Sequence, residues 1–69
     1  MKLIKENIIT EVEFKNGKGF HLGEYAFDGI ITGFKKIDDY IIEVLLADGF
    51  EGWAVYIDVN GDEVEYNED

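Results

Sequence analysis

Residues 40–66 read YIIEVLLADGFEGWAVYIDVNGDEVEY, in which three apolar runs are separated by Asp48-Gly49 and Asn60-Gly61. Asp-Gly and Asn-Gly favour two-residue hairpin loops, because both central positions of these loops need a positive φ angle. Loops at these two sites place one apolar set on a common face: Tyr40, Ile42, Val44, Leu46, Trp53, Val55 and Ile57. Because the two turns agree on that face, the sequence predicts a three-stranded antiparallel meander.

The same loops predict the cross-strand neighbours within this meander. The first loop pairs Val44 with Trp53, which we expect to lie at the centre of the core. The second loop puts Asp58 opposite Glu63 on the outer face, where two carboxylates repel each other. Such crowding raises carboxyl pKa values in the folded state, so we expect the free energy of unfolding to rise as the pH falls.

The rest of the chain continues the β pattern, since no segment shows sustained helical periodicity. We predict strands at 8–14, 19–22, 30–36, 40–47, 50–59 and 63–66, and a loop over 23–28. A three-residue loop at 16–18 pairs Phe14 with Phe20 and places His21 opposite Glu13. A three-residue loop at 38–40 pairs Phe34 with Val44. The predicted fold is all-β, a small antiparallel meander of five to six strands that curls into a barrel or half-barrel.

The stretch DGIITGF at 28–34 is followed by the strand at 40–46, by Asp48-Gly49 and by Gly52-Trp53-Ala54. This pattern covers roughly half of the chain and resembles the middle three strands of SH3-like and Tudor-like barrels. The resemblance implies an SH3-like barrel or half-barrel. The chain shows no proline-binding aromatic cluster and no aromatic cage, so the resemblance carries over no binding site.

Length and composition indicate a single domain over residues 1–69, with a frayed acidic tail at 67–69. The absence of Cys excludes disulfides and thiolate metal sites, and small domains usually need such a support, so a dimer or an unusually aromatic core is worth considering. The start, Met1 to Ile4, shows no secretory signal, and charges interrupt every long apolar run. We therefore expect a cytoplasmic protein, in the host cytoplasm if it is phage-encoded.

Residue types needed for common catalysis are missing, which predicts that the chain is not an enzyme and uses no cofactor. Without Ser or Cys, a Ser- or Cys-based triad cannot form. Thr10 and Thr32 have no evident base, and so small a barrel offers no deep cleft for paired carboxylates.

Asp58, Asn60 and Asp62 have the spacing of a calcium-binding loop that would end at Asp69, which leaves calcium open as an alternative. However, the sixth position of that loop requires Gly and is Glu63 here. A hairpin explains the same residues, so we expect no metal.

Charge gives the strongest functional indication. The formal net charge is −10, and all six Lys lie in residues 1–36 together with five acids, whereas residues 37–69 hold eleven acids and no base. An acidic surface of this kind disfavours direct binding to nucleic acid, which needs clustered Lys or Arg. It favours docking on a basic protein.

We therefore predict a non-catalytic acidic protein that acts as an inhibitor by occupying a basic, nucleic-acid-binding surface, such as that of a nuclease. Glu63 and Glu65, about 6.6–6.8 Å apart on an extended strand, are spaced comparably to successive backbone phosphates. In size and charge the chain is similar to small phage inhibitors of host nucleases. The predicted partner-binding residues are Asp38, Asp39, Glu43, Asp48, Phe50, Glu51, Tyr56, Asp58, Glu63 and Glu65.

An alternative is a structural or regulatory subunit that forms a homodimer or binds a partner through an outer apolar patch of Ile41, Leu45, Phe50 and Tyr56. For Ile41 and Leu45, packing beneath a closing barrel is the competing interpretation, and it is slightly favoured.

Overall fold

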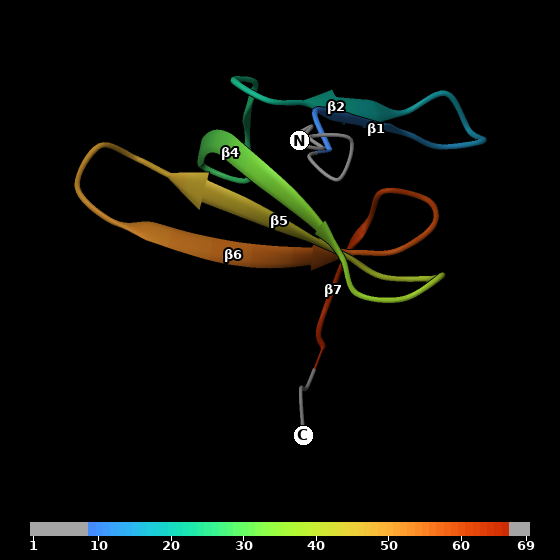
Figure 1. Cartoon of the computed structure of the whole chain (residues 1–69). Helices are drawn as coiled ribbons and strands as arrows, with labels where there is room; N and C mark the ends of the chain where they lie inside the picture. The colour runs from blue at the N-terminus through green and yellow to red at the C-terminus, as the bar shows by residue number, and fades with distance from the viewer. Residues whose placement is uncertain (1–8, 67–69) are drawn as a thin grey trace, which may run out of the picture.

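The computed structural model describes residues 9–66, and all the regular structure in this range is β-strand. The strands are β1 (Glu11–Glu13), β2 (Gly19–His21), β3 (Tyr25–Ala26), β4 (Gly29–Lys36), β5 (Ile42–Ala47), β6 (Gly52–Ile57) and β7 (Glu63–Val64). β1 and β2 form a hairpin, and the other five strands form one antiparallel sheet in the order β3-β4-β5-β6-β7 (Figure 1). The predicted all-β meander is therefore confirmed. The predicted tail at 67–69 lies outside the described residues.

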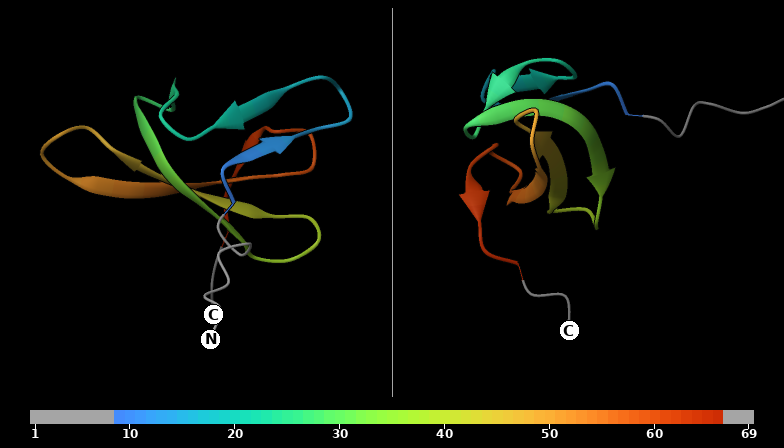
Figure 2. Two further views of the ribbon diagram at one scale, coloured as in Figure 1. Left: turned by 45° about the horizontal axis from the view of Figure 1, so that its top comes forward. Right: turned by 90° about the vertical axis from the view of Figure 1, so that its left-hand side faces the viewer.

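The five-stranded sheet curls into a half-barrel because β4 is strongly bent (Figure 2). The register between β4 and β5 shifts between Ile31 and Gly33, which is a β-bulge, and bulges increase the local bend and twist of a strand. The bulge also puts Ile31 and Phe34 on the inner face although they are three residues apart, and both are buried. β4 thus lines the core along most of its length.

The β1–β2 hairpin lies across the open side of the curled sheet, and the core fills the space between them (Figures 1 and 2). The buried centre consists of Ile31, Phe34, Val44, Leu46 and Ile57. Val12 and Phe20 from the hairpin and Trp53 and Val55 from β6 pack around it. Trp53 is half-buried at the edge of this core and lies opposite Leu46, not opposite Val44 as predicted.

The segment predicted as a loop over 23–28 contains the short strand β3, which pairs with β4 through a tight hairpin. The two central residues of its turn, Phe27 and Asp28, have positive φ angles of 54° and 69°. Two-residue hairpins need this geometry, but they usually take it with Asn-Gly or Asp-Gly. Here the central pair is Phe27-Asp28, one residue before the Asp28-Gly29 dipeptide, so the turn pattern alone does not locate it. The Phe27 ring packs against Phe20, with 5.3 Å between the ring centroids.

The predicted register is correct at one hairpin and shifted at the others. Phe34 lies opposite Val44, as the three-residue loop at 38–40 predicts. β5 and β6 are displaced by two residues, so that Val44 faces Val55, and an even displacement keeps every side chain on its predicted face. β1 and β2 are also displaced by two residues, so His21 lies opposite Glu11 instead of Glu13.

The hairpin of β6 and β7 is displaced by one residue, which moves the side chains of β7 to the other face. Glu63 lies opposite Ile57, and Val64 lies opposite Tyr56. The predicted crowding of Asp58 against Glu63 is therefore wrong.

One end of the barrel is closed by contact between the β1–β2 loop and the β6–β7 loop. The Asn16 side chain donates a hydrogen bond to the Asn60 carbonyl (3.0 Å), and Lys18 forms an ion pair with Asp62 (2.9 Å). Gly61 is buried beneath the ring of Phe14, so close that a Cβ at this position would lie 3.0 Å from two ring carbons. The backbone of Gly61 also has a positive φ angle of 80°. This loop contact joins the two ends of the described chain.

Candidate functional site

The acidic and aromatic residues predicted to bind a partner are not brought together but fall in three places. Asp48, Phe50 and Glu51 form the β5–β6 loop at one end of the sheet, on the left of Figure 1. Asp38 and Asp39 in the β4–β5 loop, and Asp58 at the start of the β6–β7 loop, lie at the opposite end. The remaining four are strand or strand-end residues: Glu43, Tyr56, Glu63 and Glu65.

Three of the predicted binding carboxylates stabilise loops of the protein itself. Asp38 accepts hydrogen bonds through Oδ1 from the backbone N–H groups of residues 40 and 41, at 2.7 and 2.9 Å. Asp48 accepts from residues 50 and 51, at 2.8 and 3.0 Å, and Asp58 accepts from residues 60 and 62, at 2.9 and 3.0 Å. Asp favours this position because its short side chain can bond to backbone groups two residues on. These acids therefore have a structural role whatever they bind.

The same hydrogen bonds set the ionisation of two of these carboxylates. Backbone N–H donors from Phe50 and Glu51 lower the pKa of Asp48 below its ordinary value. Those from Asp62 and Asn60 lower the pKa of Asp58, and the charge of Lys18 adds a smaller effect in the same direction. Donors of this kind favour the charged form. The shift of Asp58 is opposite in direction to the one that the sequence led us to expect.

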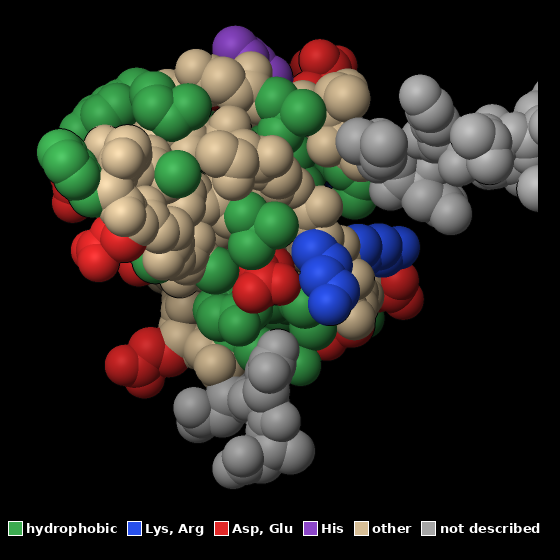
Figure 3. Space-filling model, turned by 60° about the vertical axis from the view of Figure 1, so that its left-hand side comes forward, with side chains coloured by type: hydrophobic (Ala, Val, Ile, Leu, Met, Phe, Trp, Pro, Cys, Tyr) green, Lys and Arg blue, Asp and Glu red, His purple; other side chains and the backbone are tan. Residues whose placement is uncertain are grey.

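The lysines of residues 1–36 neutralise part of the acidic half at the end where the barrel closes. Lys18 pairs with Asp62, and Lys36 lies 3.5 Å from Asp39. Lys35 lies opposite Glu43 across β4 and β5. The separation of charge along the sequence is therefore incomplete in space. In the view of Figure 3 the acidic side chains are scattered around apolar ones and do not form one block.

Five of the predicted binding acids are exposed and form none of these ion pairs. Within residues 9–66, no ion pair involves Asp38, Asp48, Glu51, Glu63 or Glu65. Asp38 lies in the β4–β5 loop, Asp48 and Glu51 belong to the β5–β6 loop, and Glu63 and Glu65 belong to β7 and the residues after it. These three segments carry the negative charge that is most available to a partner.

The outer face of the curled sheet is more apolar than its neighbouring loops. Leu45 is 39% exposed and lies opposite Ala54. The slightly favoured interpretation, in which Leu45 packs beneath the closing barrel, is therefore wrong. Ile41 is half-buried. Tyr56 is also half-buried, its ring lies 5.0 Å from that of Tyr66, and its hydroxyl donates a hydrogen bond to Glu43 (3.4 Å). Phe50 is not part of this face but stands at the loop tip with 97% of its surface exposed.

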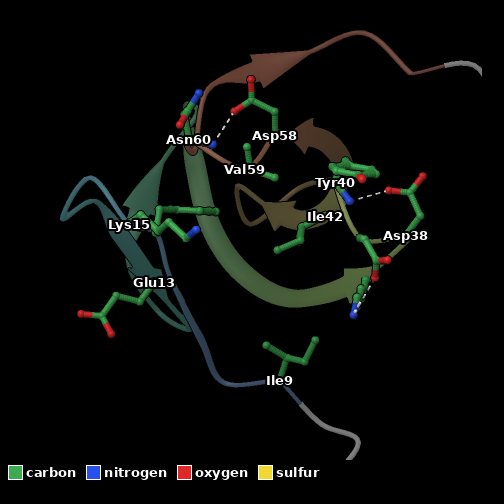
Figure 4. A pocket seen from close by; sticks show the side chains of 12 residues that line it. Ile9, Glu13, Lys15, Asp38, Tyr40, Ile42, Asp58, Val59 and Asn60 are labelled. Carbon is green, nitrogen blue, oxygen red and sulfur yellow. Dashed lines mark hydrogen bonds and ion pairs between the residues drawn. The ribbon is translucent and has the colours of Figure 1, made fainter.

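A groove of about 460 Å³ lies at the closed end of the barrel, beside the β4–β5 and β6–β7 loops (Figure 4). Its lining includes apolar side chains and both acids and lysines at its rim. The sequence predicts a binding role for Asp38, Asp39 and Asp58 but not for Tyr40 and Val59, which also line the groove. Tyr40 was assigned to the core face, yet it is 70% exposed, because β5 begins only at Ile42. In the sequence, Tyr40 and Val59 are each a large apolar residue directly after a loop Asp, and this pattern could have identified them.

The geometry of the titratable groups offers little for a metal or for acid–base catalysis. Within residues 9–66, no group of three or more His, Asp and Glu side chains is arranged to hold a metal ion. Oδ1 of Asp58, the first position of the suggested calcium loop, is occupied by two backbone N–H donors, and Asp69 lies outside the described residues. His21 is exposed, with Nδ1 3.0 Å from the Leu22 carbonyl and Nε2 3.8 Å from Glu24.

The chain matches no protein-family model, and comparisons with curated proteins and with solved structures gave no match. Across residues 9–66, the structure contains no helix of the length and hydrophobicity needed to cross a membrane.

Proposed function

We propose that this protein is a non-catalytic, acidic binding protein that docks on a basic surface of another protein. The observation that carries the proposal is the set of exposed acids in residues 37–66, the part without a base, that form no ion pair with another described residue: Asp38, Asp48, Glu51, Glu63 and Glu65. Charges left unpaired at a surface act through their field, which speeds association with an oppositely charged partner. An SH3-like or Tudor-like relationship remains part of this proposal, supported by the curled half-barrel.

The sharper form of the proposal is an inhibitor that imitates nucleic acid, of the kind that phages direct against host nucleases. Glu63 and Glu65 are two positions apart, at an edge of the sheet, where they can approach a groove on a partner. Such a partner would be a nuclease or another nucleic-acid-binding protein, and the site of action would be the cytoplasm.

The experiment uses the basic proteins of a cell lysate, collected beforehand on a heparin column and applied to the immobilised chain. We expect retention to fall between about 50 mM and about 500 mM salt, because screening weakens charge attraction. Added duplex DNA should compete for the retained proteins. Replacing Glu63 and Glu65 together by Lys should abolish retention.

The matched control replaces Glu11 and Asp28, which are also exposed and do not line the groove of Figure 4, by Lys. It makes the same change in net charge on the first half of the chain. Equal loss in both variants would leave only non-specific charge attraction and refute a defined docking surface. Retention that is insensitive to salt would refute the proposal as a whole. Asp58 is unsuitable for replacement by Lys, because its carboxylate holds the β6–β7 loop.

A second candidate function is an apolar interface with another copy or with a partner. It is favoured by Leu45 and Ile30, which are 39% and 41% exposed on the outer face, and by the nearly fully exposed Phe50. Sedimentation at rising protein concentration tests it. If the outer face forms a dimer, the wild type should double in mass and Leu45→Lys should stay monomeric. A wild type that remains monomeric would rule out the dimer.

A further inference from the structure

The groove at the closed end of the barrel combines an apolar surface with open access. Ile9, Phe14 and Ile42 line it while also packing against the core, so their positions are set by the fold. Tyr40 and Val59 line it from the two neighbouring loops and are 70% and 51% exposed. At about 460 Å³ the groove falls in the size range of sites that bind small ligands.

The rim of the groove is net negative. Its charged residues are four acids and two lysines: Glu13, Lys15, Lys36, Asp38, Asp39 and Asp58. Lys36 and Asp39 neutralise each other in an ion pair (3.5 Å). Asp38 and Asp58 each use Oδ1 for backbone N–H groups, and Oδ2 accepts no hydrogen bond from residues 9–66. Their carboxylates are thus held in place with one oxygen available for a cation.

We propose that this groove binds a segment of a partner protein in which a large apolar side chain is flanked by Lys or Arg. The apolar lining would bury the large side chain, and the net negative rim would attract the flanking cations. The inference rests on the proposed function and names the part of the partner that is recognised. It involves a different surface from Glu63 and Glu65, so the two can fail separately.

The test is a titration of the full-length, ¹⁵N-labelled protein with the peptide Ac-Gly-Arg-Phe-Lys-Gly-NH₂, followed by NMR. We expect shifts of the amide signals of Ile9, Tyr40 and Asn60, and none at Phe50. The peptide Ac-Gly-Glu-Phe-Glu-Gly-NH₂ should leave the spectrum unchanged. The double variant Asp38→Asn, Asp58→Asn keeps an acceptor oxygen for each loop but removes both charges, and it should bind about fivefold more weakly.

The matched control is Glu11→Gln, Asp28→Asn, which removes the same charge from two exposed residues that do not line the groove and should bind the peptide like the wild type. Val59→Ser should weaken binding, whereas Phe50→Ala should not. Equal weakening in both charge variants, or shifts spread over the whole surface, would overturn the proposal.

Two other occupants of the groove would also overturn the proposal. If a second copy fills the groove, the amide signals of Ile9, Tyr40 and Asn60 will shift with protein concentration in the absence of peptide. If residues 1–8 of the same chain fill the groove, binding of the Arg-Phe-Lys peptide will be seen only in a variant that begins at Ile9. Should the peptide fail while the immobilised chain still retains basic proteins, the groove assignment is wrong and the acidic docking proposal stands.

Discussion

Replacing Gly61 by Ala tests the loop contact that closes the barrel. Gly61 has a φ angle of 80°, and an L-residue in this region is strained by about 1–2 kcal/mol. The new methyl group would also lie 3.0 Å from two carbons of the Phe14 ring, which must move. Displacing a packed side chain costs about 1–3 kcal/mol. Together we expect a loss of about 2–5 kcal/mol in the free energy of unfolding, a large share of the stability of a domain this small.

The assay is urea unfolding followed by the fluorescence of Trp53, the chain's single tryptophan. Gly49→Ala is the matched control, because Gly49 has a φ angle of 97° but nothing within 4 Å of its would-be Cβ. It should lose only the strain of about 1–2 kcal/mol. In a Phe14→Leu background, the cost of Gly61→Ala should fall to the same value. An equal loss for Gly61→Ala and Gly49→Ala in the wild-type background would refute the packing of Phe14 on the β6–β7 loop.

Three further predictions concern stability. Trp53→Ala should lower the free energy of unfolding by an amount near the lower end of about 3–5 kcal/mol, because Trp53 is half-buried. Unfolding followed by circular dichroism measures this loss, and an unchanged stability would contradict the packing of Trp53 on the core. The lowered pKa values of Asp48 and Asp58 give stability that is present above their ordinary value of 3.8 and lost as the pH falls through the folded values. Between about pH 5 and about pH 2.5 the wild type should therefore lose more of its urea midpoint than Asp48→Asn, Asp58→Asn, and an equal loss would show that these hydrogen bonds do not set the pH dependence. Phe50→Ala should change the free energy of unfolding by less than about 0.5 kcal/mol, because the ring is 97% exposed, and a larger loss in urea unfolding would mean that the ring is packed.

The sequence predicted which face of the sheet each side chain of the central strands occupies better than it predicted the cross-strand pairs. The inner and outer faces of β5 and β6 follow from the alternation of apolar residues, which an even displacement of register preserves. The displacement itself arises because the Asp48 side chain bonds to the N–H groups of Phe50 and Glu51, which lengthens the loop beyond Asp-Gly. At the next hairpin, Asp58 bonds to residues 60 and 62 in a similar way, and there the displacement is odd.

The candidate site was less predictable, because its residues were chosen by charge, and charge says little about where a loop points. Asp38, Asp48 and Asp58 each begin a loop and bond to backbone N–H groups of that loop. An Asp at the start of a loop is typical of such bonding, which is a stronger indication than partner binding. Grouping Glu63 with Asp58 failed because it depended on a register set by the β6–β7 loop. The groove depends on contacts between loops distant in sequence, for which a single sequence gives no pattern.

The contact of the β1–β2 loop with the β6–β7 loop has a consequence for the order of folding. Lys18 and Asp62 are 44 residues apart, whereas β4, β5 and β6 are joined by short hairpins. Long loops are entropically costly to close and contribute late, so the meander should form in the transition state before the hairpin docks. Weakening the Phe14–Gly61 contact should then accelerate unfolding and leave the folding rate nearly unchanged. The lifetime of the folded protein would be governed by the detachment of the β1–β2 hairpin.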